Sequence, residues 1–395
     1  MNYKYDFETL IDRKGTFSCK WGGCSENELP MWVADMDFKA APEIIEALQK
    51  RLNNGIYGYT YIPEEWYEAY QYWWKKRHNL EISKDSLIFC TGVVPAISTA
   101  VRKLTTAAEN VLIQTPVYNV FCNSIRNNGR NILESPLAYS NGEYSINWKD
   151  LEEKLSDPQT TLMILCNPHN PVGKIWNKET LAKIGELCSE YNVKVISDEI
   201  HCDITDPGKE YVPFASVSET CANISVSCMA PTKCFNIAGL HTAAVMVPNP
   251  ELNHKMWRAL NTDEVAEPNA FAVEAAIASF TKGENWLNEL REYVKENKNR
   301  IKEYISNNIS DLHIVPSEAT YLLWLDCTKI TNDSIALAEF IREKTGLFLS
   351  NGTQYGGNGQ FFMRLNTACP KKLIEDGLTR LKQGIEFWKK SQKLL

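Results

Sequence analysis

Residues 161–201 read TLMILCNPHNPVGKIWNKETLAKIGELCSEYNVKVISDEIH. Two short apolar runs rich in β-forming residues, TLMILCNP and VKVISDE, lie towards the two ends of this stretch. Between them, KETLAKIGELCSEY repeats apolar residues at spacings of three and four, which is typical of a helix with one buried face. A strand, a helix and a strand in this order predict a βαβ unit with two parallel, covered strands.

The same alternation continues on both sides of this unit, from about residue 85 to about residue 250. Four more β-rich runs occur there, separated by helical patterns such as VPAISTAVRKL: SLIFCTG (86–92), NVLIQTP (110–116), ISVSCMA (224–230) and TAAVMVP (242–248). No internal repeat is visible. The sequence therefore predicts one mostly parallel sheet covered by helices.

The pattern changes after about residue 283. A long charged helical pattern, a strand-like run and a second helical pattern follow: NWLNELREYVKENKNRIKEYI, TYLLWLD and DSIALAEFIREKT. A chain of 395 residues is also longer than one hydrophobic core usually serves. We predict a large domain over residues 49–282 and a smaller α/β domain over residues 283–395, with residues 1–48 packing against the smaller one.

The overall composition argues against several classes of protein. The net charge of -7 disfavours nucleic acid as a partner, because phosphate binding needs a basic surface. The first residues lack the apolar core of a signal peptide, and no run approaches the roughly 20 apolar residues of a membrane span. The 12 cysteines are scattered without a C-x-x-C pair, so neither a metal nor a disulfide framework is expected. We expect a cytoplasmic protein with reduced thiols.

Polar and glycine-rich groups follow five of the predicted strands. Because ligands of open α/β sheets lie beyond the carboxyl ends of the strands, these groups outline one site. They are Thr91-Gly92, Pro116-Val117-Tyr118, Asn167 to Gly173, Asp198 to His201 and Pro231-Thr232-Lys233.

Each group also has an ordinary structural interpretation. Gly92 and Val93 could form a plain helix cap, or the helix amides could hold an anion. Tyr118 could be core packing, and Asp198 could cap a helix or be a buried charge that needs a cationic or donating partner. Most lysines are surface charges, but Lys233 follows a strand among apolar neighbours. Such a lysine can have a depressed pKa and supply the neutral amine needed to form an imine.

Four ordered motifs, NPHNPVG, SDEIH, APTKCFNIAGL and RLN, resemble fold-type I pyridoxal phosphate (PLP) enzymes, the aspartate aminotransferase superfamily. Within it, the chain looks like the MalY/PatB group of cystathionine β-lyases and cysteine-S-conjugate β-lyases, which includes cystalysin. The supporting segments are DRKGTFSCKW, LPMWVADMDF, YGYT, TGVVPAI, TPVY, SEATYLLWLD and FFMRLN. The resemblance implies a large domain with a mostly parallel seven-stranded sheet, a smaller C-terminal α/β domain, PLP as cofactor and a homodimer.

The resemblance assigns a role to each matching residue. Lys233 matches the lysine that forms a Schiff base with PLP and can then take the substrate Cα proton. Asp198 matches the acid that keeps the pyridine nitrogen protonated, so that the ring accepts electrons. Asn170 matches the donor to the ring's phenolic oxygen, and the resemblance allows a cis bond to Pro171. Tyr118 matches the aromatic residue stacked on the pyridine.

Gly92 and Val93 match the residues whose backbone amides hold the phosphate of PLP, and Thr232 matches a residue that adds a hydroxyl. His201 occupies the position where aminotransferases often have a tyrosine that bonds the ring oxygen, and D-E-I-H there looks like the lyase group.

The resemblance extends to the substrate and to a second subunit. Arg364 matches the arginine that binds the substrate α-carboxylate through its planar fork. Tyr59 matches a tyrosine that reaches the neighbouring subunit's phosphate, with Tyr57 as an alternative. His241 is a departure, because many aminotransferases carry a phosphate-binding arginine there.

The resemblance implies α,β-elimination on an L-cysteine S-conjugate such as cystathionine, giving a thiol, pyruvate and ammonia. The alternatives are an aminotransferase on the same scaffold and a lyase with a second role that binds a regulatory protein. A nicotinamide dehydrogenase is disfavoured, since no G-x-G-x-x-G follows a strand. An apolar pocket for the leaving thiol could include Trp32, Met36, Trp66 and Tyr355, although each could equally be core.

Overall fold

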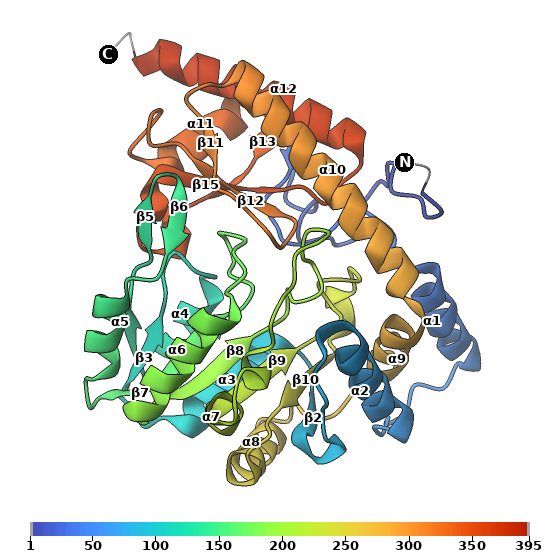
Figure 1. The fold of residues 1–395 in the computed structure, drawn as a ribbon. Coiled ribbons are helices and arrows are strands. Elements are labelled where there is room, and N and C mark those ends of the chain that lie inside the picture. Colours follow the sequence, from blue (N-terminus) through green and yellow to red (C-terminus); the bar gives the residue numbers. More distant parts are fainter. Residues whose placement is uncertain (1–2, 393–395) are drawn as a thin grey trace.

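The computed structural model describes residues 3–392, and these contain two main sheets of seven and four strands. Figure 1 shows the larger sheet in the lower half of the molecule and the smaller one above it. The long helix α10 (Glu284–Asn308) crosses diagonally from one half to the other. Within the described range, no helix combines the length and the apolarity that crossing a membrane would need.

The larger sheet confirms the predicted fold class. Its strand order is β2–β10–β9–β8–β7–β3–β4, and all neighbours from β9 to β4 are parallel, whereas β10 is antiparallel to both of its neighbours. All six β-rich runs of the sequence form strands of this sheet. The strands are β2 (Leu87–Cys90), β3 (Asn110–Ile113), β4 (Asn131–Glu134), β7 (Thr160–Cys166), β8 (Lys194–Asp198), β9 (Ser225–Met229) and β10 (Ala243–Met246).

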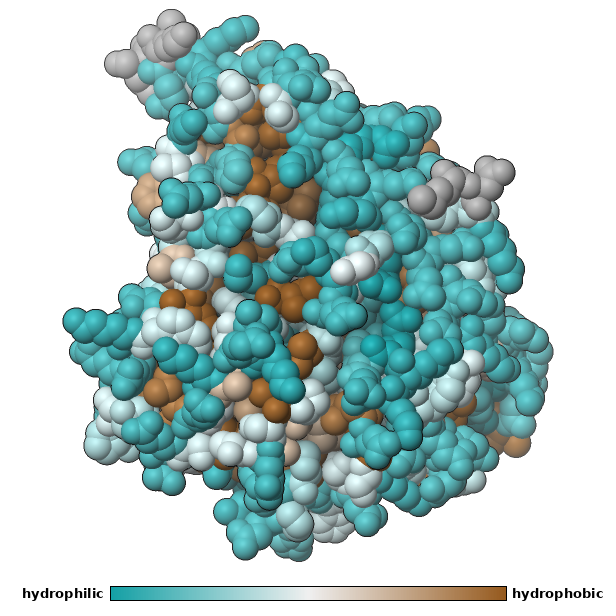
Figure 2. All heavy atoms as spheres, in the orientation of Figure 1, coloured by the Kyte–Doolittle hydropathy of each residue, from teal (hydrophilic) through white to brown (hydrophobic). Residues whose placement is uncertain are grey.

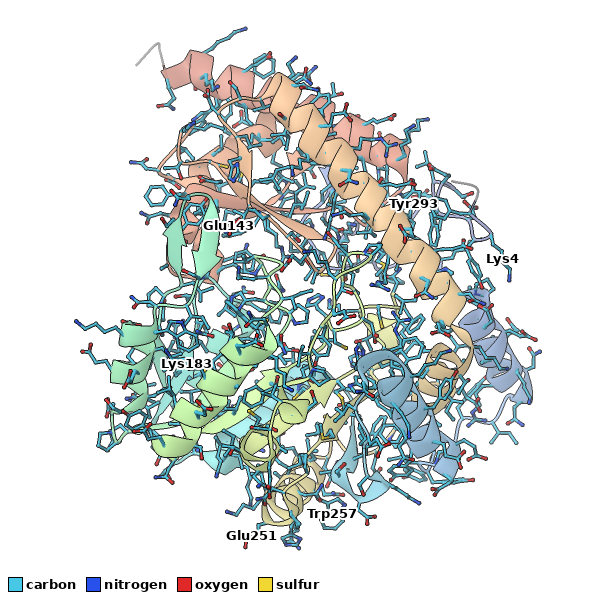
Figure 3. The ribbon with its side chains drawn as sticks, viewed as in Figure 1. Lys4, Glu143, Lys183, Glu251, Trp257 and Tyr293 are labelled. Carbon is cyan, nitrogen blue, oxygen red and sulfur yellow. The ribbon has the colours of Figure 1, made fainter. Side chains whose placement is uncertain are left out.

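Helices cover both faces of the larger sheet, as the continuous apolar strands predicted. Because successive strand residues point to opposite faces, Ile164 packs in a cluster with helices α3, α4 and α8, and its neighbour Leu165 packs with α5, α6 and α7. On α8, Met256 is fully buried while Trp257 points outward (Figure 3). The covering helices are α3 (Val93–Leu104), α4 (Val120–Arg126), α5 (Trp148–Leu155), α6 (Lys178–Glu190), α7 (Glu219–Ile224) and α8 (Pro250–Thr262).

The smaller sheet has the order β11–β12–β15–β14, with antiparallel neighbours throughout. The apolar side chains of one face, such as Leu323 and Met363, pack in a cluster with α10 and two further helices, whereas Trp324 and Phe362 pack with the helices of the larger sheet. The elements are β11 (His313–Ile314), β12 (Leu322–Asp326), β14 (Ser350–Asn351), β15 (Phe362–Asn366), α11 (Ser334–Thr345) and α12 (Lys371–Gln392). A hairpin of β5 (Ala138–Ser140) and β6 (Glu143–Ser145) lies beside this part of the chain in Figure 1.

The N-terminal segment contacts both halves of the molecule. Strand β1 (Leu29–Pro30) pairs with β13 (Leu347–Phe348) of the C-terminal part. Helix α1 (Pro42–Asn54) instead packs against α9 (Ala272–Lys282), and α2 (Glu64–His78) packs there too. A boundary after residue 48 falls inside α1, so the division of the chain into domains stays a prediction.

The surface seen in Figure 2 is mostly hydrophilic, and hydrophobic residues show as separate patches between polar side chains. The fold positions the site through the parallel strands, because β2, β3, β7, β8 and β9 all end at the same edge of the larger sheet.

Candidate active site

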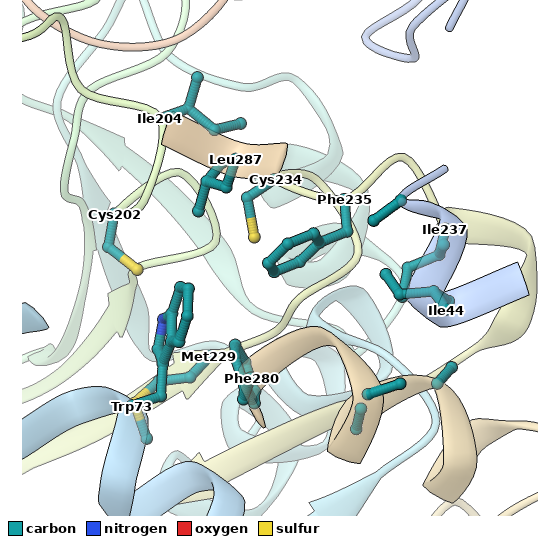
Figure 4. Close-up of a cluster of buried hydrophobic side chains, with 14 of the residues drawn as sticks. Ile44, Trp73, Cys202, Ile204, Met229, Cys234, Phe235, Ile237, Phe280 and Leu287 are labelled. Carbon is teal, nitrogen blue, oxygen red and sulfur yellow. The ribbon is translucent and has the colours of Figure 1, made fainter. Parts of the chain in front are cut away.

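Lys233 lies in the turn that follows β9, and two hydrogen bonds close this turn. The amide of Phe235 donates to the Pro231 carbonyl (3.0 Å), and the amide of Ile237 donates to the Thr232 carbonyl (3.0 Å). Phe235 anchors the turn in the core beside Phe280 and Trp73 (Figure 4). This packing holds the backbone of the lysine in one place.

The Lys233 amine faces a backbone carbonyl of the N-terminal segment. Its Nζ donates to the Ala34 oxygen at 2.6 Å. Burial, followed by the positive charge of Arg364, lowers the pKa of Lys233 to about 8. A substantial neutral fraction near pH 7 to 8 is what an amine needs to attack a carbonyl carbon.

Asp198 ends β8 and is buried, with 5 % of its surface exposed. Its Oδ1 accepts the amide of Ile200 at 3.2 Å. Burial raises the pKa of Asp198 to about 7, although the nearby Lys233 charge opposes the rise. A buried carboxylate of this kind gains most from a cationic hydrogen-bond donor, such as a protonated ring nitrogen.

Arg364, in the middle of β15, links the smaller sheet to the end of β7. Its Nη1 donates to Asn170 Oδ1 (3.2 Å) and its Nη2 to the Trp32 carbonyl (2.8 Å). The guanidinium also lies over the Tyr355 ring, 5.0 Å from its centroid. Its Nε is buried without a hydrogen-bond partner among the described residues. This leaves a donor for a ligand carboxylate. The Asn170–Pro171 bond is cis.

Two of the three phosphate-binding residues of the prediction lie at the start of α3. Gly92 precedes the helix with extended backbone, and Val93 is its first residue. A Cβ added to Gly92 would approach Pro95 Cδ to 3.2 Å, so the tight turn favours glycine. The first amides of a helix lack helical acceptors and attract anions. Thr232, at 8 % exposure, lies beside Lys233.

Tyr118 and His201 complete the group of predicted residues near Lys233. Burial, and then the charge of Asp198, raise the pKa of Tyr118. Burial, with the charges of Lys233 and Arg364, lowers the pKa of His201 to about 3. The imidazole is therefore neutral, and its buried Nδ1 has no hydrogen-bond partner among the described residues.

The structure does not bring three other residues into this group. Tyr59 lies fully exposed between α1 and α2, and none of the hydrogen bonds among the described residues involves it. Tyr57 is 50 % exposed and donates to the Leu52 carbonyl at 2.8 Å. His241 is exposed after a short 3-10 turn, with a positive φ of 52°.

Sequence reasoning missed two groups that contact the lysine's surroundings. The Ala34 carbonyl accepts from Lys233 and also from the hydroxyl of Tyr321, at 2.9 Å. Both residues belong to motifs noted in the sequence, LPMWVADMDF and SEATYLLWLD, but neither carries a conspicuous signal. Of the four residues considered for an apolar pocket, Trp66 is core, since it is fully buried against Tyr70.

A second set of polar groups lies near the turn of residues 231–237 that carries Lys233 (the lysine loop), since Cys234 Sγ is 3.9 Å from Asp203 Oδ2. His78, Cys202 and Asp203 have potential metal-ligand atoms within 4.8 Å of one another. The Asp203 carboxylate already accepts from Trp73 Nε1 at 2.9 Å and lies 3.2 Å from Arg77 Nε. The Asp203 carboxylate therefore belongs to a buried hydrogen-bond network, which accounts for its position without a metal ion.

The arrangement fits the cofactor that the resemblance implies. It combines an amine with a lowered pKa, a buried carboxylate, the first amides of α3 and a guanidinium whose Nε has no hydrogen-bond partner within residues 3–392. These features match an aldehyde carbon, a ring nitrogen, a phosphate and a substrate carboxylate, respectively.

The chain belongs to the aminotransferase class I and II family, whose model matches residues 27–381. It is 42% identical to cystathionine beta-lyase PatB of Bacillus subtilis (strain 168), over 96% of this chain and 100% of that protein. Cystalysin of Treponema denticola, solved with pyridoxal 5'-phosphate, superposes with a TM-score of 0.94 at 33% identity, covering 97% of this chain and 99% of cystalysin. A PLP-bound protein of Clostridium difficile 630, named a candidate aminotransferase, also has a TM-score of 0.94, at 40% identity over 97% of this chain and 100% of that one.

The raised pKa of Asp198 predicts a pH-dependent stability once the cofactor is removed. The folded state holds this proton more tightly than the unfolded chain, so the contribution is complete below about pH 4 and is lost as pH rises to about 7. A pKa difference of about three units between the folded and the unfolded state corresponds to a change of about 4 kcal/mol in the free energy of unfolding. We expect Asp198→Asn to become more stable relative to the wild type across this range.

Urea denaturation of both cofactor-free proteins at pH 4.5 and 7.5 measures the difference. A difference that is constant with pH would contradict the assignment. Added PLP should reverse the order, because only the aspartate can pair with a cationic ring nitrogen.

Proposed function

We propose that this chain is a PLP-dependent carbon–sulfur β-lyase that converts L-cystathionine or another L-cysteine S-conjugate to a thiol, pyruvate and ammonia. The observation that carries the proposal is the 42% identity to a cystathionine beta-lyase over 96% of this chain and 100% of that protein. The convergence of Lys233, Asp198 and Arg364 supports it independently, since this set suits chemistry at the Cα of an amino acid.

The residues that would hold PLP come from several strand ends. Lys233 would bond the cofactor, Asp198 would pair with its ring nitrogen, and Asn170 and His201 would lie at its ring oxygen, with Tyr118 against the ring. Gly92, Val93 and Thr232 would hold the phosphate. When bound, PLP supplies a covalent link to the substrate amino group and an electron sink for the charge left on Cα.

The chain's own groups would bind the substrate and move its proton. Arg364 binds the α-carboxylate, which fixes the Cα–H bond relative to Lys233. The neutral amine of Lys233 takes the Cα proton as a general base. The Cβ–S bond then breaks, the sulfur leaves with the bonding electrons and is protonated to a thiol, and water converts the remaining fragment to pyruvate and ammonia.

A product assay tests this proposal against the aminotransferase alternative. The PLP-loaded protein is incubated with L-cystathionine, with and without an added keto acid, and thiol, pyruvate and new amino acid are measured. Thiol and pyruvate without keto acid support the lyase. Amino exchange that depends on the keto acid, without thiol release, would replace it with a transaminase.

We also propose that the protein is a homodimer with shared active sites. The segment that follows α1 exposes an unusual number of large apolar side chains, which a second copy would cover. They are Ile56 (72%), Tyr57 (50%), Tyr59 (103%) and Tyr61 (79%). In this arrangement Tyr59 reaches the partner's phosphate site, which would account for its full exposure and for its lack of a hydrogen bond among the described residues.

Mixed dimers test the sharing. Lys233→Ala and Tyr59→Ala are each expected to be poorly active, but random mixing restores one intact site in half of the dimers, or about a quarter of wild-type activity. Activity is measured after co-refolding, with the same mixture of separately folded proteins as control. No recovery in the mixed dimers would exclude a site completed by Tyr59 of the partner.

The remaining assignments rest on the sequence pattern. We propose a large domain over residues 49–282, a smaller one over 283–395 and an N-terminal segment over 1–48. The pairing of β1 with β13 supports packing of this segment with the smaller domain, whereas α1, where the segment ends, lies against α9. The net charge of -7 and the reduced cysteines support a cytoplasmic protein that does not bind nucleic acid.

A further inference from the structure

A buried ion-pair cluster lies next to the carbonyl that accepts from Lys233. Lys20 and Asp37 are 1 % and 4 % exposed, and Lys20 Nζ lies 2.6 Å from Asp37 Oδ2. Arg13 bridges the two acids of the segment, with Nη2 2.7 Å from Asp35 Oδ2 and Nη1 2.7 Å from Asp37 Oδ1. Trp21 Nε1 donates to Asp37 Oδ1 at 2.8 Å.

Every charge of this cluster has a partner. Buried charges are costly to separate, so the cluster favours one arrangement of its backbone. The guanidinium of Arg13 also donates to the Met36 carbonyl at 3.1 Å, and Lys20 Nζ lies 3.5 Å from the Asp35 carbonyl. The backbone from residue 35 to 37 is therefore fixed by side chains that come from residues 13 to 21.

The lysine loop is attached to the same backbone at two points. Lys233 donates to the Ala34 carbonyl, and the side chain of Asn236 forms hydrogen bonds with the backbone of Met36. Asn236 Oδ1 accepts the Met36 amide (3.0 Å), and its Nδ2 donates to the carbonyls of Met36 (3.0 Å) and Phe38 (2.8 Å). A shift of residues 34–38 would therefore move the acceptor of the amine.

We propose that Arg13, Lys20 and Asp37 are positioning residues for Lys233 in the proposed elimination. They fix the Ala34 carbonyl opposite the amine, and Arg13 compensates the negative charge of Asp35 beside it. This inference rests on the proposed function, because it assigns the positioning of the base in that reaction.

Several groups face Lys233 and together set its protonation. The charged ones are Asp35 from the N-terminal segment, Asp198 from β8 and Arg364 from β15. The uncharged titratable ones are His201 and Tyr321, whose hydroxyl shares the Ala34 carbonyl with Lys233, and Tyr118 lies beside Asp198 and Arg364. Of these groups, Asp35 is the one held by Arg13. Loss of the Arg13 charge removes the nearer of the two cations at this carboxylate and leaves Lys20 Nζ, 3.7 Å from Asp35 Oδ1, as the other. The less compensated carboxylate favours the cationic form of a nearby nitrogen.

The test compares the wild type with Arg13→Met, Arg13→Lys and the control Lys298→Met, all loaded with PLP. Lys298 is a control for the loss of a paired cation, and a stringent one, because its pair with Asp206 (Nζ to Oδ1, 2.7 Å) is 5 % exposed whereas Arg13 is 21 % exposed. Neither Lys298 nor Asp206 contacts Lys233 or residues 34–38 among the hydrogen bonds of the described residues. Two quantities are measured, the pH midpoint of the cofactor's visible absorbance and kcat with KM on the conjugate.

Arg13→Met should raise the absorbance midpoint by about one pH unit and lower kcat by about tenfold, with KM changed much less. Arg13→Lys keeps the charge but loses the fork, so its midpoint should stay while kcat falls. Lys298→Met should keep the wild-type midpoint and kcat. If Arg13→Met behaves like Lys298→Met in both measurements, the proposal is overturned.

Two further results are decisive in the same way. If Arg13→Met does not fold, Arg13→Lys decides, since wild-type kcat in that variant overturns the positioning role and a reduced kcat at an unchanged midpoint supports it. If the wild type shows the lysine-dependent absorbance but releases no thiol, the proposed lyase function fails on its own. The absorbance midpoint then decides the role of Arg13.

Discussion

Lys233→Ala is expected to lose the visible absorbance of the lysine–cofactor bond and to lower thiol release by at least about a thousandfold. The substitution removes two functions at once, because Lys233 Nζ both bonds the cofactor and takes the proton from the substrate Cα. The turn that carries it is held by Phe235, which is fully buried, so the substitution should leave the fold intact. An absorbance spectrum and a thiol assay measure the two losses.

Two controls separate this effect from a general loss of charge. Lys233→Arg keeps a cation at the site but cannot form the bond, so it should behave like the alanine variant. Lys282→Ala removes an exposed lysine at the end of α9 and should behave like the wild type. Full activity of Lys233→Ala, without the absorbance band, would refute the assignment of Lys233.

Arg364→Lys is expected to lower kcat/KM by about a hundredfold, mainly through KM. The guanidinium holds Asn170 Oδ1 and the Trp32 carbonyl and still has a buried, unused Nε. An ammonium group is a point charge without a planar fork. It cannot keep these bonds and also bind both oxygens of a carboxylate. Steady-state kinetics over a range of conjugate concentrations measures the effect.

Arg126→Lys, at the exposed end of α4, is the matched control and should change neither parameter. The Arg364 variant should keep the cofactor's absorbance, since it acts on the substrate. An unchanged KM in Arg364→Lys would place the substrate carboxylate elsewhere.

Much of the fold could be predicted from the sequence because the strands of a covered parallel sheet are apolar on both faces. Six of the seven strands have this signal. The seventh, β4, is an edge strand that begins at Asn131 and ends at Glu134, both exposed, and its pattern is weak. The pairing of β1 with β13 was also missed, because two residues carry no periodicity and their partners lie more than 300 residues away.

The residues of the candidate site that act through reactive or charged side chains could be predicted from the sequence. Lys233, Asp198 and Asn170 follow parallel strands, which end at one edge, so topology alone brings them together. Arg364 comes from the other sheet, and only the resemblance indicated it. The Ala34 carbonyl was missed because any residue has a carbonyl, and Tyr321 because an apolar strand hides its hydroxyl.

The ion-pair cluster was missed for a different reason. Arg13, Lys20 and Trp21 were noticed only as part of a motif, since charged residues near a chain terminus are usually solvated. Their partners are Asp35 and Asp37, which lie 15 to 24 residues further along the chain, and of the three only Lys20 is fully buried. Only the three-dimensional structure shows that these charges neutralise one another beside the lysine.

The proposed lyase activity is tested most directly by the number of turnovers per active site without any keto acid. PLP-loaded protein is mixed with excess L-cystathionine, and thiol and pyruvate are counted against the protein until release stops. We expect equal amounts of both products, in many equivalents per site. Absence of thiol and pyruvate, with about one equivalent per site of the keto acid of intact cystathionine and the cofactor left in its aminated form, would show a transamination half-reaction and contradict the account.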